Sequence, residues 1–189
     1  PTELKKTLFR QTKESMAAVA MRHINNNDMV MLDSSTTCLA LAKEMIRSGM
    51  DLTIITNALH ICELCNETDN NIKLVCAGGT FRKQTMAFTD SSTVSSLRRY
   101  CADISFISPA KISREMGLAD NILSESLVRQ TMLEQSQKRC LIADHTKFEG
   151  NANILFAGLD RLDILITDQK LDEEWEKYLI DKNIKTEYC

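Results

Sequence analysis

Short apolar runs alternate with amphipathic stretches along most of the chain. Each run is only a few residues long and is apolar on both faces, so it predicts a buried strand rather than an independent helix. Strands are predicted at residues 29–32, 52–55, 72–76, 104–107, 139–143 and 163–166.

The stretches around these runs place apolar residues three and four positions apart, which predicts helices with one buried face. Helices are predicted at residues 13–25, 37–47, 59–67, 91–99, 124–137 and 172–179, the first of them ended by the three asparagines at 25–27. Strands that alternate with amphipathic helices build a parallel sheet with both faces covered. The predicted fold class is therefore α/β, with one open, mostly parallel sheet and helices on both faces.

Length and composition fit a folded domain without a membrane segment. The chain has 189 residues, 43% of them apolar, and at this length one compact domain is the default and two small ones are possible. With 23 Lys plus Arg against 26 Asp plus Glu, the net charge is −3 and no long basic tract occurs, which argues against nucleic-acid binding by this chain alone. No run of about 18 apolar residues occurs, so we expect no membrane partner and a cytoplasmic location.

The first dozen residues are polar and basic. Pro1 is followed by Lys5, Lys6, Arg10 and Lys13. We interpret this segment as a solvated helix face rather than a nucleic-acid-binding arm.

The seven cysteines are best interpreted as reduced thiols that fill the core, because their number is odd and most lie in apolar segments. His60, Cys62 and Cys65 place three soft ligands within one or two helical turns. A closed zinc site needs a fourth ligand, and neither a second CxxC motif nor paired histidines supply one. We therefore expect no metal and no cofactor.

Ligands of open α/β sheets bind beyond the carboxyl ends of the strands, and polar residues follow the predicted strands here. Asp33, Ser34, Ser35, Thr36 and Thr37 come directly after the first strand and before a helix. Hydroxyls and backbone amides at a helix N-terminus hold phosphate groups well. The alternative is an ordinary N-cap, but four consecutive hydroxyls exceed what a cap requires. The loop therefore predicts an anion site.

Other strand ends bring further polar groups to the same edge. The polar residues after any single strand are a weak signal alone, and the Gly-Gly pair after the third strand is equally compatible with a plain turn. Together they suit a phosphorylated, polyhydroxylated small molecule, since lysine offers a point charge and amides and carboxylates bind hydroxyls. The residues concerned are Thr56, Asn57, Gly78, Gly79, Lys111 and Lys147.

Glu125 and Arg129 lie four positions apart on one predicted helical face. One interpretation is a surface ion pair worth a few tenths of a kcal/mol. The other is that Glu125 reaches into the cleft at the strand ends and accepts hydrogen bonds from ligand hydroxyls.

In this order and spacing, the motifs resemble the ligand-sensing domain of the DeoR-type family of bacterial sugar-metabolism repressors. The resemblance covers nearly the whole chain. The segments that carry it are Leu32-Asp33-Ser34-Ser35-Thr36-Thr37, Thr56-Asn57, Gly78-Gly79, Phe106-Ile107, Gly117-Leu118, Glu125, Ala143-Asp144-His145-Thr146-Lys147-Phe148 and Leu165-Ile166-Thr167-Asp168.

The resemblance implies a sheet of the ribose-5-phosphate isomerase type that senses phosphorylated sugars. It implies that residues 33–37 form the phosphate and sugar loop, with Glu125 and Lys147 closing the cleft. Such repressors carry a winged helix-turn-helix before the sensor, and we see no such segment here. We therefore expect residues 1–27 to connect to that missing module and residues 28–189 to form the sensor, with DNA as a partner only through the module.

Three positions depart from the family pattern. Ser35 stands where the family usually has Gly, an expected Gly near Thr89-Asp90 is missing, and the turn after the fourth strand reads Pro109-Ala110-Lys111-Ile112 in place of an Ala-Asp-Gly-Ile-like sequence. The last change removes a carboxylate and adds a cation. These departures bear on the identity of the ligand more than on the fold.

The leading hypothesis is an effector-binding and oligomerisation domain without catalytic residues, which forms a homodimer or homotetramer as readers of palindromic operators do. One rival is a sugar-phosphate isomerase, in which Glu125 would act as base beside Lys111 or Lys147. The other rival is a ligand-free oligomerisation scaffold.

Overall fold

The computed structural model describes residues 2–189, and side chains for all of these except 2–8 and 149. Pro1 and the side chains of Lys5 and Lys6, which belong to the predicted basic segment, lie outside the described part.

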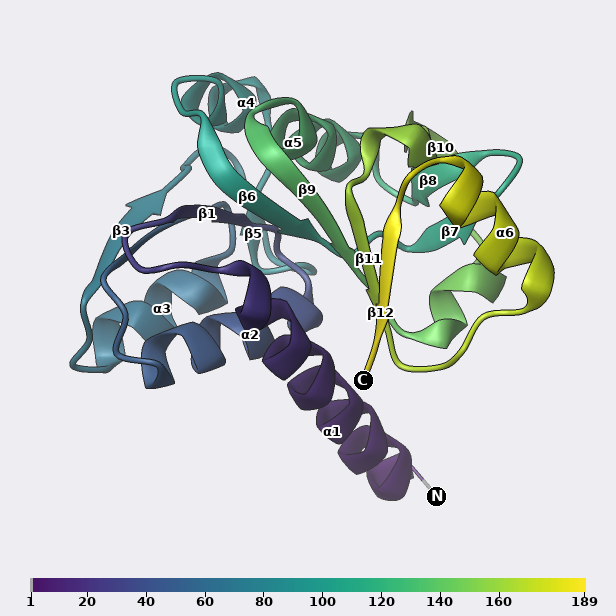
Figure 1. Ribbon diagram of the computed structural model, residues 1–189. Helices are drawn as coiled ribbons and strands as arrows, with labels where there is room; N and C mark the ends of the chain where they lie inside the picture. Colours follow the sequence, from purple (N-terminus) through teal and green to yellow (C-terminus); the bar gives the residue numbers. More distant parts are fainter. Residues whose placement is uncertain (1) are drawn as a thin grey trace.

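The centre of the molecule is a seven-stranded sheet in which every neighbouring pair is parallel (Figure 1). Its order is β12-β11-β9-β6-β1-β2-β3. The strands are β1 (Met29–Leu32), β2 (Leu52–Thr56), β3 (Ile72–Cys76), β6 (Ala102–Ile107), β9 (Ser136–Ile142), β11 (Ile164–Thr167) and β12 (Lys185–Tyr188). All six predicted strands are confirmed, and the open parallel sheet is confirmed with them. The edge strand β12 was missed because its residues are polar and half-exposed.

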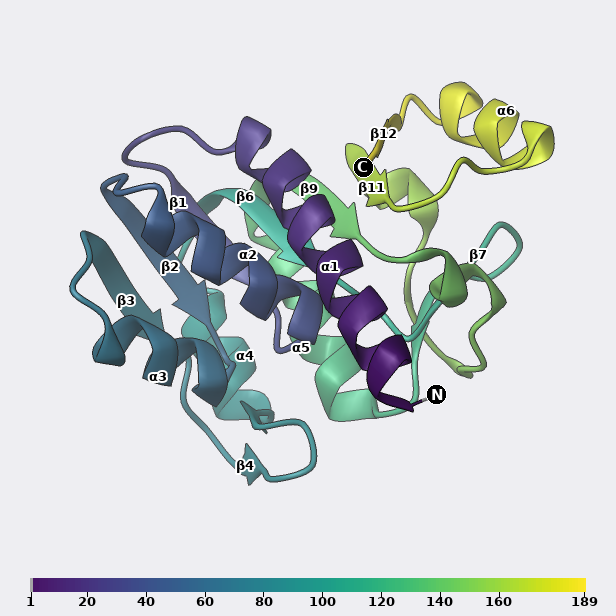
Figure 2. The same ribbon diagram turned by 90° about the horizontal axis from the view of Figure 1, so that it is seen from below.

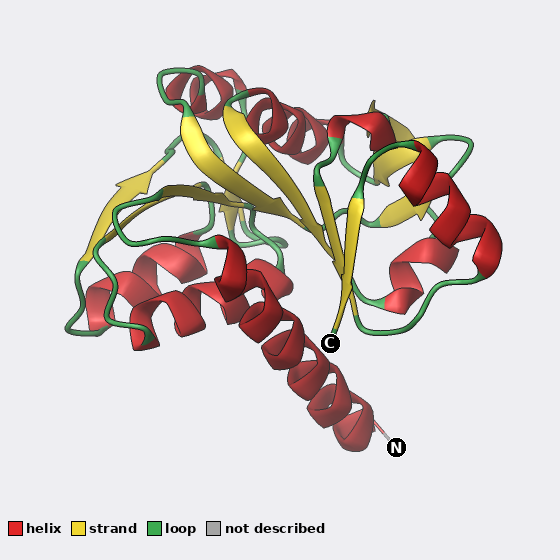
Figure 3. Cartoon of the chain, in the orientation of Figure 1, coloured by secondary structure: helices red, strands yellow, loops and turns green. Residues whose placement is uncertain are grey.

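Helices cover both faces of the sheet, as predicted (Figures 1 and 3). On one face lie α1 (Thr2–Ala20), α2 (Thr36–Arg47) and α3 (Leu59–Glu67), and on the other α4 (Ser91–Leu97) and α5 (Leu123–Glu134). The last helix, α6 (Glu173–Asp181), lies beside β12. Each face has its own apolar core, because alternate strand residues such as Val30 and Met31 are buried on opposite sides.

The first helix differs from its prediction. Regular α1 ends at Ala20, and a 3₁₀ turn, Met21–His23, follows it. Asn27 adopts a left-handed conformation with φ 70° in the turn before β1. Two further 3₁₀ turns lie later in the chain, His145–Glu149 after β9 and Leu159–Arg161 before β11.

Two small antiparallel sheets were not predicted. One is the hairpin of β4 (Phe81–Arg82) and β5 (Ala87–Phe88), and the other contains β7 (Lys111–Ser113), β8 (Gly117–Asp120) and β10 (Ile154–Ala157). Periodicity gives little signal for β4, β5, β7 and β8, which are short and carry no long apolar run. The strand β10 is an apolar run as long as β1, and the prediction missed it.

The order of strands creates a switch point between β1 and β6. From β1 the chain adds β2 and β3 on one side, whereas β6 and the later strands extend the sheet on the other side. The connections after β1 and β6 therefore leave the sheet edge in opposite directions and open a crevice at the carboxyl ends of these two strands. The fold places the polar loop 33–37 at this crevice.

Among the described residues, no helix is long and apolar enough to cross a membrane. Cys38, Cys65 and Cys140 are buried, as expected of small core residues, but Cys76, Cys101 and Cys189 are exposed. The described side chains include no group of three or more His, Cys, Asp or Glu arranged to hold a metal ion.

Candidate functional site

A cavity of about 510 Å³ lies at the crevice between β1 and β6. Its walls come from the loops after β1, β6, β8 and β9, from α1, α2, α3 and α5, and from the β4–β5 hairpin. It is lined by Lys13, Ser34, Ser35, Thr36, Thr37, Leu39, His60, Gln84, Thr85, Met86, Ser108, Pro109, Ala110, Asp120, Asn121, Ile122, Glu125, Arg129, Asp144 and Lys147.

The loop after β1 points the beginning of α2 at this cavity. Ser35 is the N-cap, and its hydroxyl accepts a hydrogen bond from the Cys38 amide at 3.1 Å. The backbone amides of Thr36 and Thr37 belong to the first turn of α2, so they have no acceptor within the helix. Ser35 thus serves as the cap, and the other three hydroxyl residues of the loop remain available to line the cavity.

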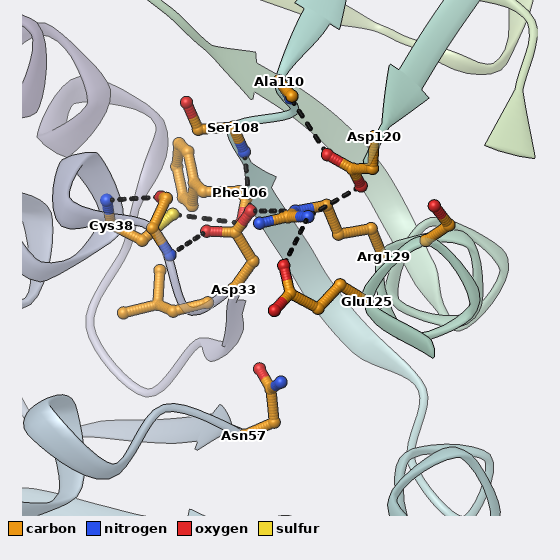
Figure 4. Close-up of polar contacts among 12 residues, drawn as sticks. Asp33, Cys38, Asn57, Phe106, Ser108, Ala110, Asp120, Glu125 and Arg129 are labelled. Carbon is orange, nitrogen blue, oxygen red and sulfur yellow. Dashed lines mark hydrogen bonds and ion pairs between the residues drawn. The ribbon is translucent and has the colours of Figure 1, made fainter. Parts of the chain in front are cut away.

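A buried ion network forms the floor of the site (Figure 4). Arg129 Nε donates to Asp33 Oδ2 at 2.7 Å, and Arg129 Nη1 donates to Asp120 Oδ2 at 2.7 Å. Asp33 also accepts hydrogen bonds from the amides of Ser35 and Ser108, and Asp120 accepts one from the Ala110 amide. These bonds tie together the loops that leave β1 and β6, because Asp33 follows one strand and Ser108 the other.

Burial and charge act in opposite directions on this network. Burial alone would raise the pKa of Asp33, but the Arg129 guanidinium and the amide donors outweigh it and lower that pKa. Burial alone would lower the pKa of Arg129, and the two carboxylates raise it instead. Asp33 and Arg129 are therefore a charged, mutually compensated pair.

Glu125 reaches into the cavity from the first turn of α5 and does not lie on the surface of the molecule. Glu125 is 8% exposed and Arg129 7%, so the interpretation as a surface pair is wrong. Glu125 Oε2 lies 3.8 Å from Arg129 Nη1, and Glu125 Oε1 lies 3.5 Å from Arg82 Nε on the hairpin. Neither distance is a hydrogen bond, and Oε1 has no hydrogen-bond partner among the described residues.

Two other buried polar atoms at the cavity share this condition. His60 Nε2 on α3 and Thr85 Oγ1 on the hairpin have no hydrogen-bond partner in the described part of the chain. Burial lowers the pKa of His60, which favours the neutral imidazole. Because buried polar groups are normally hydrogen-bonded, their presence at one cavity indicates a site that receives partners from a ligand or from water.

Thr56 and Asn57 shape the site without lining the cavity. Thr56 Oγ1 donates to the Leu32 carbonyl oxygen at 2.8 Å and accepts from the Ala58 amide at 3.1 Å, which ties β2 to the end of β1. Asn57 Nδ2 donates to the Phe88 carbonyl oxygen at 2.9 Å and so holds the β4–β5 hairpin in place.

The structure does not bring Gly78, Gly79 or Lys111 to the cavity. Gly79 packs against the beginning of α4, where Thr93 Oγ1 donates to the Gly78 carbonyl oxygen at 3.0 Å. Lys111 begins β7 and pairs with Ala119 across the small sheet. The alternation of side chains along a strand places the lysine outside, whereas its neighbour Ala110 lines the cavity.

Two lysines reach the cavity near the start of α2. Lys147 lies in the 3₁₀ turn after β9, and Lys13 lies on α1, where its Nζ donates to Thr36 Oγ1 at 2.6 Å. Burial lowers the pKa of Lys13, Asp144 raises it, and the charge of Lys147 lowers it further. Together these two cations and the N-terminus of α2 make this part of the cavity suitable for an anion.

Sequence reasoning missed several lining residues. Lys13 was assigned to a solvated helix face, and Asp120, Thr85 and His60 were not considered as ligand contacts. Asp120 and Thr85 lie in or beside short strands that were themselves missed. For Lys13, the only available signal was its place three residues before Met16, at the start of the apolar pattern of the helix.

The model of the DeoR C terminal sensor domain matches residues 9–169. The chain belongs to this family. The resemblance drawn from the motifs is thereby confirmed, and a regulatory sensor role follows at the level of the family.

Curated relatives of this family member are regulators of transcription. The chain is 28% identical to the HTH-type transcriptional regulator IolR of Bacillus subtilis over 97% of this chain and 72% of IolR. It is 30% identical to the uncharacterized HTH-type transcriptional regulator YulB of the same organism, over 92% of this chain and 66% of YulB. With GlpR of Haloferax volcanii, also an HTH-type transcriptional regulator, the identity is 30% over 86% of this chain and 62% of GlpR. The chain thus spans roughly two thirds of the length of these relatives.

Solved structures share the fold at low sequence identity. Ribose 5-phosphate isomerase A of Methanocaldococcus jannaschii gives a TM-score of 0.51 at 13% identity, over 71% of this chain and 52% of the isomerase. The eIF2B delta subunit of Chaetomium thermophilum gives 0.57 at 11% identity, over 82% of this chain and 54% of that protein. The expected sheet of the ribose-5-phosphate isomerase type is confirmed.

Proposed function

We propose that this domain binds a phosphorylated sugar in the cavity between β1 and β6, as the effector of a DeoR-type transcriptional regulator. The observation that carries the proposal is that one cavity combines an anion-binding corner with an unpartnered, buried carboxylate oxygen. A phosphate group and sugar hydroxyls are the complements of these two features.

The anion corner consists of the first turn of α2 with Lys13 and Lys147. Backbone amides at a helix N-terminus, the helix dipole and lysine ammonium groups all favour a phosphate. Thr36 is exposed to the cavity at this point, so a ligand oxygen has access to its hydroxyl.

The sugar side of the proposed site consists of Glu125, with His60 and Thr85 nearby on the cavity wall. Glu125 Oε1 is an acceptor without a donor, and a sugar hydroxyl supplies that donor. A buried acceptor that gains its hydrogen bond only on binding contributes both affinity and discrimination against analogues that lack the hydroxyl.

The ion network leaves little of the site available for catalysis. Isomerisation requires a general base, commonly a carboxylate, that is available to take a proton from the substrate. Asp33 and Asp120 are committed to Arg129 and to backbone amides, which leaves Glu125 as the one carboxylate of this network with an unpartnered oxygen. An effector acts by binding two conformations of the regulator with different affinities, and it needs no catalytic group.

The remaining parts of the proposal concern the whole regulator. The relatives are of the HTH type and are longer than the matched region, so we assign DNA binding to a winged helix-turn-helix that precedes α1. Residues 1–27 would then connect the two modules, and residues 28–189 would form the sensor. We further assign a homodimer or homotetramer to the assembled regulator, because palindromic operators require symmetry, and a cytoplasmic location, where it meets DNA.

A thermal-shift screen against sugar phosphates, their unphosphorylated parents and inorganic phosphate tests the effector site. A ligand at 100 times its Kd adds about 2.7 kcal/mol of stability, a shift of roughly 5–10 °C for a domain of this size. We expect one phosphorylated sugar to stabilise the domain more than its parent sugar or phosphate does. Stabilisation by none of them would favour the ligand-free scaffold instead.

Two variants on α5 sharpen this test. Glu125→Gln keeps the shape of the side chain but removes the carboxylate. It should therefore weaken the binding of the sugar phosphate more than the binding of inorganic phosphate. Glu134→Gln makes the same change at an exposed position of the same helix outside the cavity and should bind like the wild type. Any compound that binds is then incubated with the domain and followed by NMR, and conversion between aldose and ketose would establish an enzyme.

A further inference from the structure

Lys13 is the point at which α1 touches the candidate ligand site. The helix packs along α2, and its second half contributes Met16, Ala17 and Ala20 to the core of the domain. Its first half runs on from Lys13 toward the N-terminus and projects beyond the sheet (Figures 1 and 2). Lys13 therefore lies where the anchored part of the helix gives way to the projecting part.

The Lys13 amine is half-buried beside a positive helix end and a second cation. Its Nζ lies 2.6 Å from Thr36 Oγ1, at the first residue of α2, where the helix dipole is positive. Burial lowers the pKa of Lys13, and of the two neighbouring charges Asp144 raises that pKa more than Lys147 lowers it. Among the described side chains, neither lysine has a carboxylate oxygen within 4.0 Å, whereas Arg129 in the same cavity has two at 2.7 Å.

The cavity carries an independent sign of a ligand. Glu125 is more than nine-tenths buried, and its Oε1 has no hydrogen-bond partner among the described residues. The same cavity thus contains a buried acceptor that makes no hydrogen bond within the described residues and two lysines whose described surroundings hold no carboxylate oxygen within 4.0 Å. The ion pair of Glu125 Oε1 with Arg82 Nε, at 3.5 Å, is too long for a hydrogen bond, so this acceptor stays available to a ligand hydroxyl.

We propose that Lys13 binds the anionic group of the effector directly, and that this contact couples occupancy of the cavity to the first half of α1. The inference rests on the proposed function and adds a residue and a route of regulation to it. In the unbound domain, Lys13 donates to the Thr36 hydroxyl. In the bound domain, the anion accepts hydrogen bonds from Lys13 and from the first turn of α2 together, and so fastens α1 to α2 at the point where α1 leaves the core.

A ligand bound in this way restricts the motion of α1, the helix that leads out of the domain. A hydrogen bond between an ammonium group and an anion, in which both partners are charged, is stronger than one between an ammonium group and a hydroxyl, so the bound state holds the helix more tightly than the unbound state does. Since the ligand gains this contact only when α1 is seated, it favours the seated state by that difference in affinity.

Inorganic phosphate is the probe, titrated against this chain at constant ionic strength with chloride as the reference anion. Binding is measured by thermal shift, and the order of α1 by hydrogen–deuterium exchange of the amides of residues 9–13. For the wild type, we expect saturable stabilisation by phosphate and slower exchange in that segment. Lys13→Met removes a charge-assisted hydrogen bond, so it should weaken phosphate binding about 10- to 100-fold. It should also abolish the slower exchange of residues 9–13 on addition of phosphate.

Two further variants separate a ligand contact from a structural role. Lys13→Arg keeps a cation and should retain binding and protection, which a purely packing role would not predict. Lys43→Met removes the same charge from an exposed position of α2 that faces the adjoining α1–α2 groove but not the cavity, and it should behave as the wild type.

Three results overturn the proposal in distinguishable ways. If the wild type binds phosphate and Lys13→Met binds it equally well, Lys13 is not a ligand contact, although the proposed effector site stands. If Lys13→Met weakens binding but exchange in residues 9–13 never responds to phosphate, the coupling to α1 is wrong. If the wild type is stabilised neither by phosphate nor by any sugar phosphate, both this inference and the proposed function fail.

Discussion

Arg129 and Asp33 are 96 positions apart in the chain and are joined by a 2.7 Å hydrogen bond between Nε and Oδ2. Both side chains are buried, and the second carboxylate partner of Arg129 is Asp120. The guanidinium thus links the loop after β1 to α5 and to β8 beneath the cavity. The floor of the site is held by charge rather than by apolar packing.

Removal of the guanidinium should therefore destabilise the whole domain. Arg129→Met leaves two carboxylates buried without their cation, and loss of one partner from a buried pair typically costs about 3–5 kcal/mol. Arg139→Met, which breaks the more exposed pair with Asp163 at 3.0 Å, is the matched control and should cost less than about 1 kcal/mol. Urea denaturation of the two variants measures both values. Equal losses would show that the buried network contributes no more than a surface pair.

The same network predicts a dependence of stability on pH. Burial would raise the pKa of Asp33, but Arg129 and the amide donors hold it below its ordinary value of 3.8. A carboxyl whose folded pKa is depressed stabilises the fold above its unfolded pKa, and that contribution is lost as the pH falls through the folded value. The stability lost in Asp33→Asn should therefore be full near neutral pH and shrink below about pH 4. Urea midpoints across this range check it, and a loss that stays constant in acid would contradict it.

The sequence predicted the main sheet because each of its central strands is apolar on both faces. The loop at residues 33–37 could also be predicted as a ligand site, because four hydroxyl residues lie there between a strand and a helix, where a parallel sheet binds ligands. What local patterns do not contain is the partner of each buried charge. The contact of Arg129 with Asp33 joins residues 96 positions apart, so the spacing of Glu125 and Arg129 alone suggested a surface pair.

Two lysines, one expected at the site and one not, show the limit of inference from strand ends. Every residue that follows a strand reaches the same edge of the sheet, but its side chain then points along either face of the connection. Lys111 follows β6 as expected and yet continues into β7, away from the cavity. Conversely, Lys13 precedes the first strand altogether and reaches the cavity because α1 crosses α2, a packing that periodicity cannot give.

The glycine pair after β3 supplies a backbone prediction. Gly79 has a φ of 152°, and a Cβ built there would lie 2.3 Å from Thr93 Oγ1 and 2.5 Å from Asp90 Oδ1. Asp90 is the N-cap of α4, and hydrogen bonds from Thr80, Ser92 and Thr93 lower its pKa to about 2. Gly79→Ala should therefore disturb this cap and lower the Tm.

Gly78→Ala is the matched control for this substitution. A Cβ at Gly78 would meet nothing within 4 Å, so the Tm should change little. Differential scanning fluorimetry measures the Tm of the two alanine variants. If the two alanine variants melt together, the close approach of Gly79 to the α4 cap has no energetic weight.

Thr36 offers the most direct test of where the anion binds. Thr36→Glu places a carboxylate at the first turn of α2, within reach of the Lys13 amine that now lies 2.6 Å from the Thr36 hydroxyl. The new charge repels a ligand phosphate and competes for Lys13, so affinity for sugar phosphates and for inorganic phosphate should be lost. The fold should survive, because acidic residues in the first turn stabilise a helix.

Thr36→Val distinguishes charge from the loss of the hydroxyl. It removes one hydrogen-bonding group of the corner and leaves the α2 amides, Lys13 and Lys147 in place, so we expect affinity to fall by about three- to tenfold, the worth of one neutral hydrogen bond. Calorimetric titration of both variants, with their melting temperatures as the check on folding, gives the comparison. If Thr36→Glu binds as the wild type does, the anion does not bind at the first turn of α2.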